Sequence, residues 1–265
     1  MHSALIPSLA ALAYFLAAAA LALSLRENRP RMLRTALWLA LPALVLHGLA
    51  HGLAWDHLNG PNLHFFAALS LVGLGMAGFT MLAASTERME ALGVLVYPLA
   101  ACLLLLYHFA GHGQAVPLGW RLLMHAWLAL LAYAALAVAA LIALMLWFQE
   151  RALRQRQIHG WLRALPPLTQ LEALLFRSLG ASFALLTLAL VTGVLFVENM
   201  LAQHLWHKTV FSVLSWIVLA TLLFGRWRWG WRGPRAVKLT LTSMALLALA
   251  FFGSKFVLEM VLRRA

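Results

Sequence analysis

Histidine is the residue type in this sequence that is best suited to chemistry, because imidazole is a common protein ligand for iron, copper and zinc. The chain has 11 histidines. Three pairs are spaced three or four residues apart: His47 and His51, His108 and His112, and His204 and His207. On a helix these spacings place both side chains on one face. Each pair can therefore converge on a metal or a cofactor.

The segments that carry these histidines are strongly apolar. Of 265 residues, 64% are hydrophobic and 11% are charged, with a mean hydropathy of +0.86. A soluble domain has about 45–50% apolar and about 25% charged residues. This composition therefore excludes a soluble fold and a disordered chain. The single cysteine, Cys102, lies in an apolar run, which excludes a disulfide framework and a thiolate metal cluster.

Apolar segments of about 20 residues are long enough to cross a bilayer as helices, and the alternation typical of barrel strands is absent from the sequence. We therefore predict an all-α, polytopic integral membrane helix bundle that forms a single transmembrane domain over residues 1–265. The eight expected helices are 3–25, 35–55, 63–84, 91–110, 122–148, 178–200, 209–224 and 237–262. Residues 149–177 are expected to form a cytoplasmic amphipathic loop.

The positions of the charges predict the orientation. The net charge is +12, and most of the 20 lysine and arginine residues follow the first, third, fifth and seventh expected helices. The positive-inside rule places those segments in the cytoplasm and both termini on the outer side. In this orientation every histidine except His159 lies in an outer loop or in the outer half of a helix.

Depth singles out His47 and His51 among these histidines. His47 lies about eight residues before Trp55, or about 12 Å along a helix, which is too deep for the imidazole to reach water. It therefore needs a partner, which is either a hydroxyl or carbonyl of a neighbouring helix or a cofactor. The interleaved Gly48 and Gly52 are spaced as in closely packed membrane helices, which is the interpretation we favour, although the lack of side chains would also let a flat macrocycle lie against the helix.

Haem is the cofactor that best fits several histidines in an apolar bundle with few carboxylates. Hard cations prefer carboxylate oxygen, and zinc sites normally include a carboxylate that orients a ligand. Haem needs one or two axial histidines and cations for its propionates. Arg121 and Lys208 lie near His125 and His207 in the sequence and are candidates for that second role. Because no Cys-x-x-Cys-His is present, we expect non-covalent haem b.

Several motifs of the second half of the chain resemble a known family. They are the segment MHAWLALLAY from Met124 to Tyr133, Ser215-Trp216, Gly230-Trp231-Arg232-Gly233 and Phe251-Phe252-Gly253. Together they resemble the cytochrome c assembly (CcsA/ResC/CcmC-like) haem-handling family, and the eight-span arrangement is most similar to its compact YpjD-like branch. The resemblance implies a bacterial inner-membrane protein that holds haem near the outer face, with His125 matching an external histidine. It also implies other cytochrome assembly proteins or an apocytochrome as partners.

The sequence departs from the synthase members of that family. Their tryptophan-rich segment W-G-x-x-W-x-W-D-x-x-E is replaced by AQHLWHK at residues 202–208, and Phe224 stands where they have a histidine. These departures argue against presentation of haem to an apocytochrome on a tryptophan-rich platform. For haem binding we predict His125 with His47 or His51 as the axial pair. His207 is a further candidate because it lies where the platform would be.

Other functions are weaker interpretations of the sequence. We find no nucleophile with a base, no phosphate loop and no paired carboxylates, so we predict binding rather than catalysis. The aromatic and basic run 227–232 is typical of membrane-interface anchors rather than of nucleic-acid binding. The alternatives are a b-type membrane cytochrome that passes electrons between quinone and a partner, and a haem-free transporter or transport accessory.

Overall fold

The computed structural model describes residues 2–27, 30–58, 60–86, 90–110, 118–156, 165–196, 206–253 and 255–256. All secondary structure in these ranges is helical, and 8 helices are long and apolar enough to cross a membrane. The predicted fold class, a polytopic membrane helix bundle, is confirmed. The side of the membrane on which each terminus lies stays a prediction. The helices are α1 (His2–Glu27), α2 (Pro30–Leu58), α3 (Phe65–Thr86), α4 (Glu90–Ala110), α5 (Trp120–Arg154), α6 (Leu168–Phe196), α7 (Trp206–Trp229) and α8 (Pro234–Ala248).

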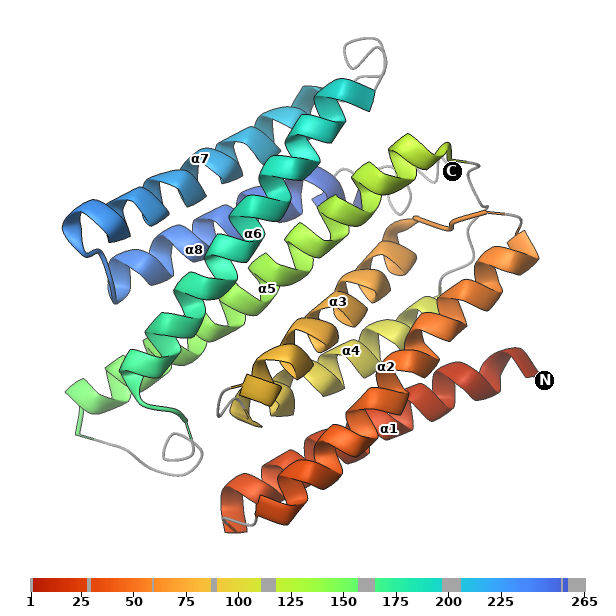
Figure 1. The fold of residues 1–265 in the computed structure, drawn as a ribbon, viewed down its shortest axis with the longest axis horizontal. Coiled ribbons are helices and arrows are strands. Elements are labelled where there is room, and N and C mark those ends of the chain that lie inside the picture. The colour runs from red at the N-terminus through yellow and green to blue at the C-terminus, as the bar shows by residue number, and fades with distance from the viewer. Residues whose placement is uncertain are drawn as a thin grey trace. The chain divides into compact units, whose positions relative to one another are not determined.

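The first of two compact units contains α1 to α4 (Figure 1). Helix α1 packs against α2 and α4, and α3 packs against α4 and α2. Small buried residues of α1, among them Ala10, Ala11, Ala17 and Ala18, allow the backbones to approach closely. Close approach matters here because helices in lipid gain their association energy from packing and hydrogen bonds.

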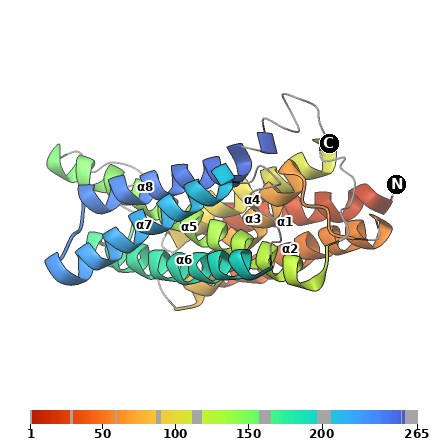
Figure 2. The same ribbon diagram turned by 90° about the horizontal axis from the view of Figure 1, so that it is seen from above.

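The second unit contains α5 to α8, which run lengthwise beside one another (Figures 1 and 2). Helix α5 packs against α6 and α8, α6 packs against α7, and α7 packs against α8. The middle of α5 is rich in buried alanine, and Tyr133 within it donates a hydrogen bond to the Leu247 carbonyl of α8. Just after α8, the backbone forms a π-helical turn, η2 (Leu249–Gly253). Such turns are frequent at functional sites.

Several helices extend beyond the expected bounds. Helix α5 continues to Arg154 rather than to residue 148, and α6 begins at Leu168 rather than at residue 178. Both ends of the expected loop 149–177 are therefore helical, while residues 157–164 lie outside the described ranges. The reason is burial: Leu171, Leu174 and Leu175 pack into the bundle, although polar neighbours lower the local hydropathy.

The glycines of α2 and α3 have different surroundings. A Cβ atom at Gly73 of α3 would lie 3.1 Å from Leu103 Cδ1 and 3.4 Å from the Cα atom of Ala100 in α4. At Gly48 and Gly52 of α2, no described atom would lie within 4 Å of an added Cβ. The expectation that Gly48 and Gly52 mediate close helix packing is therefore wrong within the described residues. Gly73 has that role instead.

This contrast predicts opposite effects of two glycine-to-alanine substitutions. Gly73→Ala should destabilise the protein by about 1–3 kcal/mol, because the methyl group meets a backbone that cannot move aside. Gly48→Ala should be neutral or stabilising by up to about 1 kcal/mol, because alanine favours the helix and nothing opposes it. Thermal unfolding of both variants in the same detergent measures the difference. Equal shifts of the unfolding midpoint would contradict this account of the packing.

Candidate functional site

A buried hydrogen-bonded cluster in the first unit joins three helices. The Nε2 atoms of His47 and His51, both on α2, each lie 2.9 Å from the hydroxyl oxygen of Ser70 on α3. The hydroxyl of Tyr14 on α1 lies 3.4 Å from His47 Nδ1. The exposed fractions are 0% for Tyr14, His47 and Ser70 and 2% for His51. Each deep histidine therefore has a hydroxyl of a neighbouring helix as a partner. This is one of the two kinds of partner that their depth predicts.

The shared serine determines the tautomers of both imidazoles. A hydroxyl has one hydrogen to donate, so Ser70 donates to one Nε2 atom and accepts a hydrogen bond from the other. If Tyr14 donates to His47 Nδ1, then His47 Nε2–H donates to Ser70, and Ser70 donates to His51 Nε2. Within this cluster of Tyr14, His47, His51 and Ser70, this direction leaves one polar group without a described partner, the Nδ1–H of His51.

The opposite direction leaves two polar groups unmet, the hydroxyl hydrogen of Tyr14 and the Nδ1 lone pair of His51. An unmet buried polar group costs about 1–3 kcal/mol, so the first direction is favoured. Aromatic packing holds the rings in place. His51 stacks on Tyr107 of α4 with ring centroids 4.5 Å apart and 10° between the planes. His47 and His51 stack on each other at 5.6 Å.

His125 on α5 has a different environment, in the second unit. Its Nδ1 atom lies 2.9 Å from the carbonyl oxygen of Ala189 and 3.3 Å from the hydroxyl oxygen of Thr192, both on α6. Because a carbonyl only accepts, Nδ1 carries the hydrogen and Nε2 carries the lone pair. The Nε2 atom makes no hydrogen bond with any described residue. A glycine on α6 makes this approach possible, since a Cβ at Gly193 would lie 3.1 Å from Cε1 of the ring.

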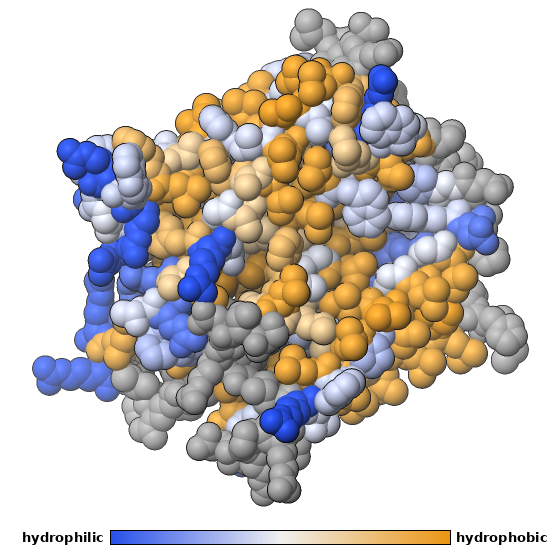
Figure 3. Space-filling view, in the orientation of Figure 1, coloured by the Kyte–Doolittle hydropathy of each residue, from blue (hydrophilic) through white to orange (hydrophobic). Residues whose placement is uncertain are grey.

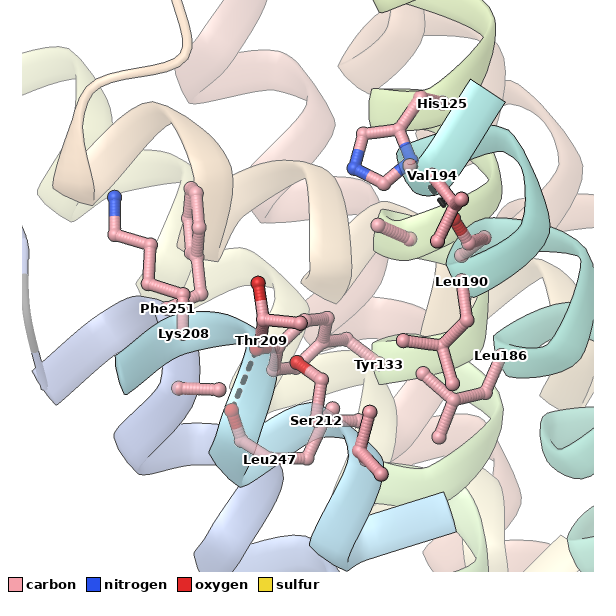
Figure 4. A pocket seen from close by; sticks show the side chains of 15 residues that line it. His125, Tyr133, Leu186, Leu190, Val194, Lys208, Thr209, Ser212, Leu247 and Phe251 are labelled. Atoms are coloured by element: carbon pink, nitrogen blue, oxygen red, sulfur yellow. Dashed lines mark hydrogen bonds between the residues drawn. The ribbon is translucent and has the colours of Figure 1, made fainter. Parts of the chain in front are cut away.

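The His125 imidazole lines a cavity of about 250 Å³ between α5, α6, α7 and the end of α8. Figure 4 shows His125 and Lys208 on opposite sides of this cavity, with Tyr133 and Ser212 between them. Most of the lining is apolar and includes Phe251 of η2. Val194 and Val213, also in the lining, are exposed, so the cavity is open to the surface.

The other predicted site residues are distributed as follows. Lys208 lies at the cavity, with Nζ 6.0 Å from the ring centroid of Phe251. Arg121 is exposed and lies over the rings of Trp120 and Phe196, and it is not among the cavity-lining residues. His207 is half-buried beside Trp206, and it does not line the cavity either. The structure thus brings His125 together with Lys208 at the cavity, and His47 together with His51 in the buried cluster.

The remaining histidines contribute less. His64 caps α3, because its Nδ1 atom accepts the backbone N–H of Phe66 at 3.0 Å. His108 packs against Phe109, and it belongs neither to the hydrogen-bonded cluster of His47 and His51 nor to the lining of the His125 cavity. The side chains of five histidines lie outside the described part of the chain: His2, His57, His112, His159 and His204. The pairs His108 with His112 and His204 with His207 therefore stay predictions.

Within the described residues, no three His, Cys, Asp or Glu side chains gather as a metal-binding group. An ion that takes all its ligands from protein side chains needs such a group. A prosthetic group that brings its own in-plane ligands needs one or two imidazoles. Among the described residues, His125 is an imidazole of this kind, because its Nδ1 is bonded to the Ala189 carbonyl and its Nε2 makes no hydrogen bond within that part of the chain.

Sequence patterns did not predict the partners that orient these imidazoles. Ser70, Tyr14, Tyr107 and Thr192 each act across a helix–helix contact, which no local spacing reveals. The signal available beforehand was a polar residue inside an apolar span, which is expensive in lipid and therefore informative. Ser70 meets that description in the sequence.

Comparisons with known proteins give one family and several similar sequences. Residues 36–262 match the family described as "Cytochrome C assembly protein". The Inner membrane protein YpjD of Escherichia coli (strain K12) is 32% identical over 260 residues, which cover 96% of this chain and 97% of that protein. A 28.8 kDa protein of Azospirillum brasilense is 31% identical, over 86% of this chain and 96% of its own length. The Cytochrome c biogenesis protein CcsA of Chlamydomonas reinhardtii is 25% identical, over 68% of this chain and 52% of its own length. No solved structure matches the chain.

The hydrogen bonds predict the tautomer of four histidines in the haem-free protein. His47 and His64 should carry the hydrogen on Nε2, whereas His51 and His125 should carry it on Nδ1. Nitrogen-15 chemical shifts of histidine-labelled protein distinguish the two forms, and His64 and His125 serve as internal standards. Ser70→Ala should change the signals of His47 and His51 and leave those of His64 and His125 in place. Identical tautomers at His47 and His51 in the unsubstituted protein would refute the shared-serine arrangement.

Proposed function

The chain belongs to the cytochrome c assembly protein family, and we propose that it binds b-type haem non-covalently, with His125 as an axial ligand of the iron. The observation that carries this proposal is the state of the His125 ring. Its Nδ1–H is bonded to the Ala189 carbonyl, and its Nε2 lies at a cavity and has no hydrogen-bond partner among the described residues. Histidines that bind metals nearly always donate their other ring N–H to a carbonyl, a carboxylate or water.

The carbonyl bond gives His125 two properties of an axial ligand. It fixes the tautomer so that the lone pair is on Nε2, and it holds the ring plane. Thr192 stabilises the same nitrogen from the next turn of α6. The His125 ring therefore does not have to reorient when haem binds, which lowers the free-energy cost of binding.

The cavity matches part of a haem rather than all of it. Its volume of about 250 Å³ lies just below the roughly 300–1,000 Å³ of most ligand pockets. The remainder of the macrocycle would extend through the open side at Val194 and Val213, whose apolar side chains suit its surface. Lys208, on the side of the cavity opposite His125, would receive a propionate (Figure 4). Arg121 is the second candidate for that role.

For the second axial position we propose His51 or His47, with His207 as the further candidate. The shared-serine cluster favours His51 over His47. The Nε2 atom of His51 accepts a single hydrogen bond from Ser70, so an iron atom would displace one hydroxyl. In His47 both ring nitrogens are engaged, and Nε2 carries the hydrogen. Ligation by His47 therefore requires a change of tautomer as well.

The cellular setting follows from the relatives. The YpjD relative is named an inner membrane protein, and we propose that this chain likewise resides in the bacterial inner membrane, with the haem near the outer face. Bound haem would supply an iron that exchanges one electron. The residues of this chain would hold and orient it and exclude water from the Nε2 side. Proposed partners are other cytochrome assembly proteins or an apocytochrome.

Absorption spectroscopy of the detergent-purified protein, expressed with adequate haem supply, tests the proposal. We expect a Soret band whose position and intensity change in His125→Ala. Gly193→Val should lower haem affinity by about 10- to 100-fold, because the larger side chain pushes the ring away from its carbonyl. One of His51→Ala and His47→Ala should also alter the spectrum.

The matched controls are His112→Ala and His159→Ala, which should leave the spectrum unchanged. Well-folded protein that shows no Soret band and takes up no added haemin would exclude haem binding. A spectrum that is unaltered by His125→Ala would instead assign the iron to other histidines, with His207 and His108 tested next.

A further inference from the structure

The turn between α7 and α8 concentrates arginine and tryptophan at one end of the second unit. The segment from Trp206 to Gly253 contains no aspartate or glutamate. Arg228, Arg232 and Arg235 of this turn are all exposed. Figure 3 shows hydrophilic side chains gathered at the left edge of the molecule, where Figure 1 places the turn and the end of α5. This surface is strongly cationic and lies next to membrane-spanning helices.

The turn has a defined structure. Gly230 and Gly233 have φ values of 66° and 58°, which glycine adopts without strain. The indole of Trp231 packs directly on α7 at Gly225, where a Cβ atom would overlap the ring. The backbone N–H of Trp231 donates to the Gly225 carbonyl at 3.2 Å, and Arg226 Nη1 donates to the Trp231 carbonyl at 3.4 Å. Trp229 stacks on Trp231 at 5.6 Å.

Exposed aromatic rings lie beside the same turn. Trp227 is 80% exposed, Trp229 is 59% exposed and Phe224 is 50% exposed. The rings of Trp227 and Trp229 lie 5.8 Å and 5.5 Å from that of Phe224. Exposed tryptophan is typical of the membrane–water interface, where one part of the ring is in lipid and the N–H is in water. The surface thus combines fixed positive charge with an adjoining aromatic surface.

A carboxylate modifies the charge on one side of the turn. Glu150 of α5 lies against the start of α8, with Oε1 2.9 Å from the position of a Cβ at Gly233. Arg154 interacts with Glu150 from the same helix. The guanidinium group of Arg235 lies 5.9 Å from the ring centroid of Trp231. Glu172 is a second carboxylate near Glu150, but the four arginines of residues 224–235 outnumber these two carboxylates, so the turn stays net positive.

We propose that the arginine–tryptophan turn, defined by residues 224–235, binds the phosphodiester headgroup of an anionic phospholipid. Arginine binds phosphate through a planar set of N–H donors, and basic pockets between membrane helices bind anionic headgroups. The acyl chains lie along Phe224 and Trp227. Because Trp231 and the two glycines fix the turn beforehand, little ordering is needed on binding. This site is independent of the haem proposal.

Native mass spectrometry of delipidated, full-length protein in detergent tests the site, with added cardiolipin or phosphatidylcholine as probes. Cardiolipin should bind preferentially. Arg232→Gln combined with Arg235→Gln should weaken cardiolipin binding by about 30-fold, which is about 1 kcal/mol for each arginine near a charged lipid surface. Both side chains are exposed, so the fold should persist, and the haem spectrum or thermal midpoint verifies this.

The matched control is Arg26→Gln combined with Arg34→Gln, which removes two exposed arginines from the first unit. It should change cardiolipin binding by less than about threefold, well under the effect expected of two arginines in contact with a headgroup. Equal loss in both double variants would show that total charge alone governs binding and would overturn the proposal. Equal binding of phosphatidylcholine and cardiolipin would overturn it too.

Discussion

An imidazole inside a membrane-spanning bundle depends on neighbouring helices for the partners of its two ring nitrogens, because lipid offers none and the helical backbone is already paired. Whether the protein satisfies one or both of these nitrogens decides whether the histidine can bind a ligand. Where both nitrogens are satisfied by protein, the histidine holds helices together. Where one is satisfied and the other faces a cavity, the histidine is ready for a ligand. His47 exemplifies the first situation and His125 the second.

Helix packing decides which situation arises. On α3, Ser70 lies where it reaches both α2 imidazoles, so a single hydroxyl links the two rings and sets opposite tautomers. On α6, Gly193 removes the side chain that would hold the α5 imidazole away, so His125 reaches the Ala189 carbonyl. The π-helical turn after α8 adds Phe251 to the wall of the cavity that faces the free nitrogen. Small residues thus contribute as much to the candidate site as the histidines do.

Much of the fold was predictable from the sequence, because a long apolar run has few alternatives to a spanning helix. The ends of the helices were less predictable. Helix α6 starts ten residues before its expected position, because buried leucines continue the helix beyond the point at which the hydropathy falls. The motifs at 124–133, 215–216, 230–233 and 251–253 together identified the family correctly. Spacing could not reveal Ser70 or Thr192, since their roles exist only across helix contacts. The interpretation of Gly48 and Gly52 failed for the same reason, because a spacing that permits close packing does not require it.

Whether Nε2 of His125 binds the haem iron can be measured by replacing the His125 side chain with free imidazole from solution. His125→Gly removes the proposed ligand and leaves a space beside α6 that imidazole can enter. We expect this variant to lose the haem spectrum of the unsubstituted protein and to regain it when imidazole is added, while imidazole leaves the spectrum of His159→Gly unchanged. If the haem spectrum of His125→Gly without imidazole equals that of the unsubstituted protein, His125 is not a ligand of the iron.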